Sequence, residues 1–203
     1  KKGDDVRIDW GYFYMAADKE NSSCATGEGK TLRKSFIDGK LTSSKTDGSD
    51  KLALVRSLGE TKKAEGHLLL GYDDLYSIQY FGENLRPYWN RNGNETIQSQ
   101  FAKADKEYDA VMDKCAAFDA NLMKEATEVG GRKYAELCAL AYRQAIAAHK
   151  LVEAPNKDLL FLSKENFSNG SIGTVDITYP SAPLFLVYNP ELAKGLMNHI
   201  FYY

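Results

Sequence analysis

The fold is decided by residues 95–152, which read ETIQSQFAKADKEYDAVMDKCAAFDANLMKEATEVGGRKYAELCALAYRQAIAAHKLV. In the first part of this stretch apolar residues recur at steps of three and four, which places them along one face of an α-helix. This stripe consists of Ile97, Phe101, Ala104, Tyr108, Val111, Cys115, Phe118, Leu122 and Ala126. We therefore predict a long helix from about Glu95 to Val129, ended by Gly130-Gly131 as a C-terminal glycine would end it.

The remainder of the stretch predicts a second helix, from about Lys133 to Val152. It is crowded with alanine, at Ala135, Ala139, Ala141, Ala145, Ala147 and Ala148. Because apolar residues nearly encircle this helix, we expect neighbouring elements to cover it on more than one side.

The chain before residue 71 has the period of β-structure. Large apolar residues alternate from Ile8 to Tyr14, and two further strands are predicted at Lys51–Leu58 and His67–Leu70. Residues 18–50 between them are rich in Gly, Ser, Thr, Asp and Lys and carry turn signals, so we expect connections there.

Helical spacing returns after residue 71. The positions of Leu75, Ile78, Leu85 and Trp89 predict a helix that is kinked at Pro87. Residues 155–180 predict a long loop with short strands, and a further helix is predicted to open at Ser181.

Near the end of the sequence, Asn189-Pro190-Glu191 has the residues of a helix start: Asn as N-cap, Pro at the first helical position and an acid in the first turn. The fold class predicted overall is α+β, with a β-rich segment over residues 1–70 and helical hairpins over residues 71–203. Such hairpins build α/α toroids. Because Lys1 is not an initiator Met and His199–Tyr203 continues an apolar helical pattern, we expect an internal piece of a larger protein.

Composition limits the classes of partner. The 203 residues carry a net charge of −2 and 27% charged residues, as in an ordinary globular protein. Neither nucleic acid nor a membrane is an expected partner, because both favour a basic stripe. The three cysteines, Cys24, Cys115 and Cys138, lack metal spacing, and their odd number argues against a disulfide framework, although a Cys115–Cys138 bridge stays open.

Two polar segments carry the candidate chemistry. The first is Gly71-Tyr72-Asp73-Asp74, where the strands give way to the helices. Adjacent carboxylates could act as acid and base or bind a cation, so Asp73 and Asp74 are catalytic candidates and Tyr72 is a substrate-binding candidate. The competing interpretation is structural: Asp74 caps the following helix and Asp73 is solvated.

The second segment is residues 163–180, SKENFSNGSIGTVDITYP, which gathers many hydrogen-bonding groups around Gly170 and Gly173. Glu165 and Asp176 are the leading acid and base candidates. Lys164 and Asn166 could hold a carboxylate or an amide of the substrate. A well-ordered loop that caps helix ends is the structural alternative.

The alanine-rich helix offers weaker candidates. Arg143 is a substrate-binding candidate, although its spacing of seven from Glu136 and Lys150 also fits a solvated line of charges. His149 lies at helical spacing from apolar residues and is interpreted as a core histidine. No metal site and no cofactor are predicted; a structural Ca²⁺ is compatible with the sequence but not indicated by it.

Long motifs in both halves resemble the glutaminase A family. They are Asp9–Tyr14, Tyr72–Asp74, Ile78–Gly82, Arg86–Trp89, Ala141–Gln144, His149-Lys150, Ser163–Asn166 with the residues up to Pro180, and Tyr188–Leu192. The resemblance implies that residues 1–70 end a β-sandwich-like N-terminal domain. It implies that residues 71–203 begin a six-hairpin α/α toroid, with later site residues outside this chain.

The resemblance also implies a hydrolase that converts L-glutamine to L-glutamate and ammonia in an extracytoplasmic, secreted or periplasmic, location of Bacteroides-type bacteria or fungi. The isolated piece is then expected to be inactive, with the remainder of its own chain as its partner. Two alternatives stay open: a six-hairpin glycoside hydrolase with a glycan as substrate, since Tyr72 and several neighbouring aromatic residues suit sugar stacking, or a non-catalytic binding module.

Overall fold

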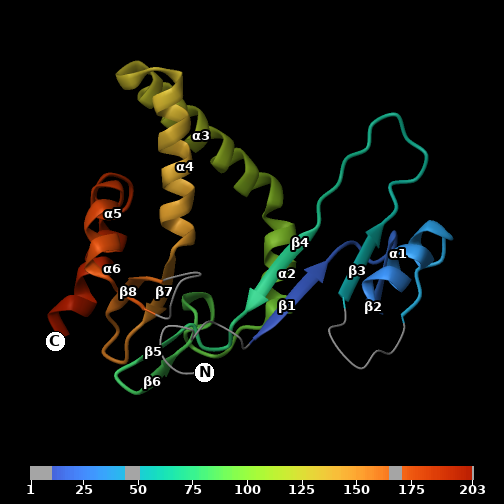
Figure 1. Ribbon diagram of the computed structural model, residues 1–203, viewed down its shortest axis with the longest axis horizontal. Coiled ribbons are helices and arrows are strands. Elements are labelled where there is room, and N and C mark those ends of the chain that lie inside the picture. The colour runs from blue at the N-terminus through green and yellow to red at the C-terminus, as the bar shows by residue number, and fades with distance from the viewer. Residues whose placement is uncertain (1–10, 44–50, 165–170, 203) are drawn as a thin grey trace. The chain divides into compact units, whose positions relative to one another are not determined.

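A computed structural model describes residues 11–43, 51–164 and 171–202 of the chain (Figure 1). The chain divides into two compact units, Tyr12–Asp73 and a unit that contains Asp74–Tyr203. Strands in the first part are followed by helical hairpins, which confirms the α+β class. None of the helices in the described ranges has the length and apolarity that crossing a membrane requires.

Within its described residues, the unit Tyr12–Asp73 contains two antiparallel strand pairs and one helix. Strand β1 (Tyr12–Ala16) pairs with β4 (Leu69–Asp73), and β2 (Ser22–Gly27) pairs with β3 (Lys51–Arg56). The strands predicted near residues 14, 51 and 70 are therefore confirmed in position. Helix α1 (Gly29–Ile37) contacts β2 and β3 and buries Leu32.

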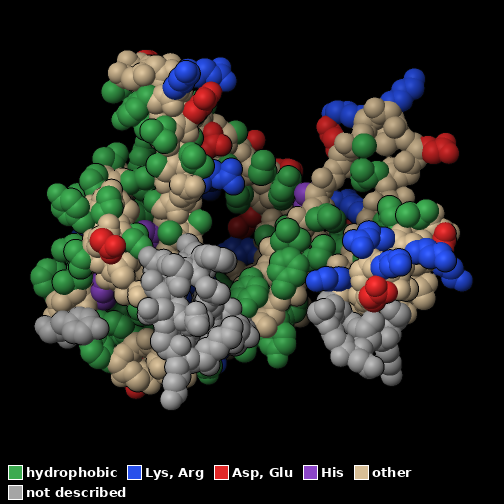
Figure 2. Space-filling model, viewed as in Figure 1, with side chains coloured by type: hydrophobic (Ala, Val, Ile, Leu, Met, Phe, Trp, Pro, Cys, Tyr) green, Lys and Arg blue, Asp and Glu red, His purple; other side chains and the backbone are tan. Residues whose placement is uncertain are grey.

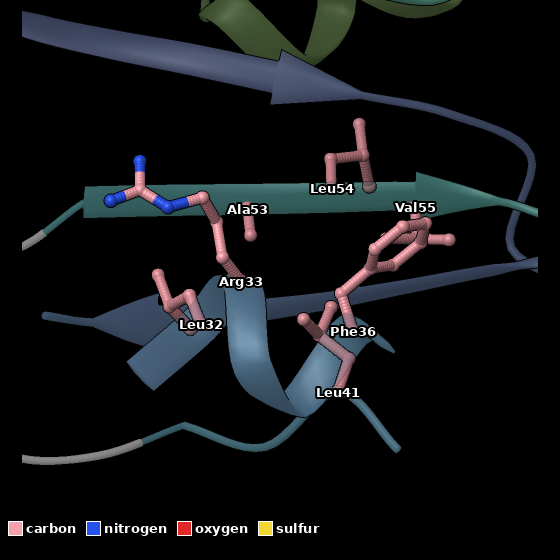
Figure 3. A pocket seen from close by; sticks show the side chains of 7 residues that line it. All are labelled: Leu32, Arg33, Phe36, Leu41, Ala53, Leu54 and Val55. Carbon is pink, nitrogen blue, oxygen red and sulfur yellow. The ribbon is translucent and has the colours of Figure 1, made fainter. Parts of the chain in front are cut away.

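The prediction that residues 18–50 only connect strands was wrong, because this segment contains β2 and α1. Strand β2 is composed of small and polar residues, so it lacks the alternation of large apolar side chains that reveals a strand. An apolar groove of about 380 Å³ lies between α1 and β3 (Figure 3). Its lining consists of Leu32, Arg33, Phe36, Leu41, Ala53, Leu54 and Val55.

The second unit begins with a β-hairpin where a helix was predicted, so the helical prediction for residues 75–89 was wrong. Strands β5 (Ile78–Tyr80) and β6 (Glu83–Leu85) are joined by Phe81 and Gly82, whose φ angles are 47° and 84°. Two positive φ angles are what a two-residue type I′ turn requires. A short 3₁₀ turn, η2 (Tyr88–Asn90), follows.

The predicted long helix is present as two helices, α2 (Ile97–Lys106) and α3 (Tyr108–Gly130). The Thr96 hydroxyl accepts a 3.1 Å hydrogen bond from the Ser99 amide and caps α2. Helix α4 (Arg132–Ala147) packs against α3. Phe118 of α3 and Tyr142 of α4 both pack against Tyr188, with ring centroids 5.4 and 5.5 Å from it.

Helix α4 differs from the prediction in two ways. It ends at Ala147, and residues predicted as its last turn form strand β7 (His149–Glu153) instead. It is also not covered all round within the described residues, because Leu137 and Leu140 are 61% and 52% exposed. Figure 2 shows such hydrophobic side chains on the surface over this helix. The three cysteines are free thiols.

Strand β7 pairs antiparallel with β8 (Leu159–Ser163), and this hairpin has a core cluster on each face. Side chains of Val152, Leu160 and Leu162 pack with Ile78 and Leu85 of the β5–β6 hairpin. Because strand side chains alternate, Phe161 points to the other face. There it packs with Phe185, Ala193 and Leu196.

Those residues come from α5 (Val175–Tyr188) and α6 (Pro190–Asn198), which is followed by the 3₁₀ helix η3 (His199–Tyr202). The start of α5 was predicted at Ser181 but lies at Val175, because the helix continues through Pro180 and Pro183. The start of α6 is confirmed: the Asn189 side chain accepts a 3.3 Å hydrogen bond from the Leu192 amide, and Pro190 is the first helical residue.

Candidate functional site

A polar cluster with a buried charge joins Asp74, Ser77 and Lys150. Asp74 Oδ2 lies 3.0 Å from the Lys150 ammonium and accepts a 2.8 Å hydrogen bond from the Ser77 hydroxyl. Asp74 is 3% exposed and Ser77 is 4% exposed. A carboxylate this deeply buried is stable only when charge and hydrogen bonds compensate it, and these two partners supply both.

The local folding of the chain brings the three side chains together. Asp74 begins a tight turn in which Leu75 has a φ of 57° and the Tyr76 amide bonds back to the Asp74 carbonyl. The Ser77 amide then bonds to Leu85 O at 2.9 Å, which extends the β5–β6 ladder. Lys150 approaches from strand β7, where it is paired with Leu162.

The cluster is asymmetric in its exposure. The Asp74 side chain is 5% exposed, whereas the Lys150 side chain is 32% exposed. The carboxylate is therefore the buried anchor, and the ammonium is the end that solvent or a ligand can reach. Since an ammonium has three N–H donors and Asp74 accepts one, Lys150 can donate further hydrogen bonds to an oxygen that carries negative charge.

The predicted helix cap at Asp74 was wrong. No helix begins at Asp74, and its carboxylate binds Ser77 and Lys150. Lys150 does not share a helix face with Glu136 and Arg143, because it lies on a strand. Glu136 instead accepts a 2.9 Å bond from Arg132 one turn earlier in α4.

In the second polar segment, residues 163–164 and 172–173 are held together by backbone contacts. Lys164 forms an antiparallel bridge with Ile172, and the Gly173 amide donates to Ser163 O at 2.8 Å. Ile172 packs on the core face that contains Leu162, and its partner Lys164 shares that face. Because Lys150 is paired with Leu162, the two lysines are diagonal neighbours on one face of the hairpin.

The other predicted site residues are placed as follows. Glu165 and Asn166 lie outside the described residues. Asp176 is exposed in the first turn of α5, and among the described residues it forms no hydrogen bond or ion pair with Asp74 or Lys150. Arg143 is exposed on α4, while Tyr72 and Asp73 end strand β4 in the other compact unit.

Sequence reasoning did not assign a site role to Lys150 or Ser77. The signal for Ser77 was a hydroxyl three residues after Asp74, a spacing that allows a local hydrogen bond. The signal for Lys150 was its place in the His149-Lys150 motif. Within the described residues, no three His, Cys, Asp or Glu side chains are grouped so that they could hold a metal ion.

His149 lies next to Lys150 but on the opposite face of the hairpin. Its ring stacks on Phe161 with centroids 4.6 Å apart and meets Phe185 edge-on at 5.4 Å. Burial lowers the pKa of His149 below its ordinary value, and the Ala145 carbonyl opposes this change only in part. The interpretation of His149 as a core histidine agrees with its 8% exposure.

The lowered pKa of His149 predicts an acid-dependent loss of stability. Since the unfolded chain binds this proton more readily, the contribution of neutral His149 is complete above about pH 6.5 and decreases as the pH falls through the folded pKa. We expect the free energy of unfolding in urea to decrease from pH 7.5 to pH 5.0, and by less in His149→Gln. An equal decrease in both proteins would contradict this assignment.

Family comparisons agree with the order of the two parts. Residues 1–125 match the model of a domain of unknown function, DUF5127, and residues 131–203 match that of the glutaminase A six helical-hairpin domain. The chain thus joins a β-rich segment to hairpins of the six-hairpin class. It belongs to the glutaminase A family. The predicted domain boundary at residues 70 and 71 stays a prediction.

Two similar proteins are named as glutaminases. The chain is 28% identical over 209 residues to Glutaminase A of Aspergillus oryzae. This alignment covers 96% of this chain and 30% of that protein. It is 34% identical over 87 residues to a protein named "Probable glutaminase" of Arthroderma benhamiae. This second alignment covers 41% of this chain and 10% of that protein. The chain therefore spans less than a third of the length of either relative. No solved structure matches the chain.

Proposed function

We propose that the protein containing this chain hydrolyses the side-chain amide of L-glutamine to L-glutamate and ammonia. The observation that carries the proposal is the buried Asp74 carboxylate holding the partly exposed Lys150 ammonium at 3.0 Å. Membership of the glutaminase A family supports glutamine as the proposed substrate.

The reaction makes three demands on a site. Water must be deprotonated as it attacks the amide carbon, the carbonyl oxygen must be stabilised as it becomes an oxyanion, and the departing nitrogen must gain a proton as the C–N bond breaks. Lys150 suits the second demand, because its N–H groups are fixed in direction by Asp74 before the reaction begins. Preorganised donors stabilise the transition state more than the neutral amide, because charge develops only there.

Except for Asp74, the remaining candidates keep their sequence-based roles as part of the proposal. Glu165 and Asp176 are the acid and base, with Asp73 as a further candidate. Asp74, a catalytic candidate from the sequence, acts here by orienting Lys150. Lys164 holds the carboxylate of the substrate with Asn166, and its shared face with Lys150 supports this role. Tyr72 and Arg143 remain substrate-binding candidates.

The test is an assay of the intact protein on L-glutamine, with ammonia release as the readout, next to a panel of glycans. Glutamine turnover that is lost in Glu165→Gln and in Asp176→Asn supports the reaction and its acid and base. Turnover that survives both substitutions removes that assignment. Cleavage of a glycan without glutamine turnover would show that the protein is a glycoside hydrolase instead. Binding of glutamine or a glycan without any turnover would favour a non-catalytic binding module.

The location of this activity is part of the same proposal. An extracytoplasmic protein, either secreted or periplasmic, is what the resemblance implies, and the small-molecule substrate would be met there. Fractionation of the native cells, with glutamine turnover measured in each fraction, tests the location directly. Activity confined to the cytoplasmic fraction would contradict it.

A further inference from the structure

A chain of hydrogen bonds links strand β5 to Gly173 and Ser163 of the second polar segment. The Tyr80 hydroxyl donates to His199 O at 3.1 Å, and His199 Nε2 lies 3.1 Å from Gly173 O. The Gly173 amide in turn donates to Ser163 O at 2.8 Å. The three contacts connect β5, η3 and the residue before Lys164. Tyr80, Gly173 and His199 also line a cavity of about 200 Å³, together with Leu162 and Ile172.

The contact with Gly173 determines which nitrogen of the His199 ring carries the proton. Gly173 O can only accept, so Nε2 carries the proton in this contact and Nδ1 is the acceptor in the neutral ring. His199 is 4% exposed, and its Nδ1 has no hydrogen-bond partner among the described residues. Its bond to Gly173 is thus the one hydrogen bond that the ring makes there.

Gly173 fits against this ring in a way that no other residue could. Its φ is +63°, and a Cβ atom at this position would lie 2.5 Å from His199 Nε2 and 2.7 Å from Cδ2. Both the backbone conformation and the close approach require glycine. The ring of His199 therefore rests directly on the backbone that pairs with Ser163.

We propose that His199 is a positioning residue, which fixes Lys164 for substrate binding by holding Gly173 against Ser163. The adjoining Ile172–Lys164 bridge transmits this restraint, and the 2.8 Å bond from the Lys164 amide to Ala148 O completes the strand at that point. The proposal rests on the proposed function for the role of Lys164. The restraint itself can be measured without any turnover.

Amide hydrogen exchange in the intact protein tests the restraint. In His199→Leu the donor to Gly173 O is lost, and we expect the amides of Gly173 and Lys164 to exchange about tenfold faster. The Ala154 amide, bonded to Asp158 O at 2.9 Å at the other end of the same hairpin, is the internal control. Exchange should return near the parent rate in His199→Gln, whose side-chain amide can replace Nε2–H. Unchanged Gly173 and Lys164 exchange, or equal acceleration at Ala154, would overturn the proposal.

Kinetics separate positioning from simple stabilisation. If Lys164 holds the substrate in ground and transition states alike, His199→Leu should raise KM for glutamine about tenfold and leave kcat within about threefold, with rescue in His199→Gln. An unchanged KM alongside faster exchange would remove the role in binding. Absence of glutamine turnover in the parent protein would contradict the proposed function. The amide exchange rates would still test whether His199 restrains Gly173 and Lys164.

A glycine pair provides a matched control. Gly173→Ala should reproduce the exchange pattern of His199→Leu, because the methyl group displaces the ring. Gly131→Ala has a similar backbone requirement, with φ +80°, but nothing lies within 4 Å of its Cβ position. Acceleration at Gly173 and Lys164 in Gly131→Ala would show that general strain, and not the lost contact, causes the effect.

Discussion

Lys150→Met is expected to lower kcat for glutamine hydrolysis by roughly 10²–10³-fold while KM changes little. Methionine keeps the apolar stem of the lysine on the hairpin face but provides no N–H donor. The oxyanion then loses a preorganised charge, whereas the neutral amide of bound glutamine loses less. The measurement is steady-state ammonia release by the intact protein at several glutamine concentrations.

Lys157→Met is the matched control for this prediction. Lys157 also pairs with a carboxylate, Glu153 at 2.9 Å, and it lies in the turn of the same hairpin, with its side chain 75% exposed. Its loss should leave both kinetic constants within about twofold, because exposed ion pairs contribute little. Equal rates for Lys150→Met and the parent protein would remove Lys150 from the reaction.

Asp74→Asn separates the ammonium from its orientation. Asparagine has a similar shape and still accepts from Ser77, but it lacks the charge that fixes the ammonium. We expect kcat to fall by less than in Lys150→Met, because the donor is still present. A larger fall in Asp74→Asn would instead indicate that the carboxylate itself takes part in proton transfer.

The sequence was most informative where one residue pattern allows one local structure. In Asn189-Pro190-Glu191, the Asn189 side chain caps a helix and Pro190 favours its first position. Both signals predict a helix start, and α6 begins there. The stripe from Ile97 to Ala126 likewise predicted helix, although not the division at Glu107 between α2 and α3.

Prediction failed where the same apolar residues fit both the period of a helix and the pairing of a β-hairpin. Ile78 and Leu85 fit a helical stripe, yet they face each other as partners in the β5–β6 hairpin. The turn residue Phe81 has a positive φ, which a phenylalanine rarely adopts, so its type I′ turn had no sequence signal beyond Gly82. Packing on the β7–β8 hairpin decides the structure there.

The candidate site was predictable only in part for a related reason. Asp74 could be selected because two adjacent carboxylates follow the last strand of the first part. Its partner Lys150 lies 76 residues away, and the alanine-rich pattern around Lys150 indicated a helix. The pairing depends on β7 leaving that pattern to join β8, which is a tertiary event.

The β7–β8 hairpin consequently separates chemistry from support. One face carries Lys150 and, at its end, Lys164, beside the cluster with Val152, Leu160 and Leu162. The other face carries Phe161 and His149 and rests on α5 and α6. A change on the second face should therefore alter stability without altering the reacting groups.

Phe185→Ala is expected to lower the free energy of unfolding by about 3–5 kcal/mol, the range for removing a fully buried aromatic ring. Phe185 is 1% exposed, and its ring meets Phe161 edge-on with centroids 5.0 Å apart. Its loss leaves a cavity under the hairpin between β8 and α6. Urea unfolding at pH 7.5 followed by circular dichroism measures the change.

The neighbouring Leu186→Ala is the control, because Leu186 is 63% exposed on the same helix. This substitution should lower the free energy of unfolding by less than about 1 kcal/mol.

Without Phe185 the His149 ring loses one wall of its apolar surroundings, so its pKa should rise toward the ordinary value and the acid-dependent loss of stability should weaken. Below the unfolding transition, kcat per folded molecule should stay near the parent value, in contrast to Lys150→Met. A Phe185→Ala protein of full stability would show that this cluster does not hold the hairpin, and a folded but inactive one would show that the two faces are not independent.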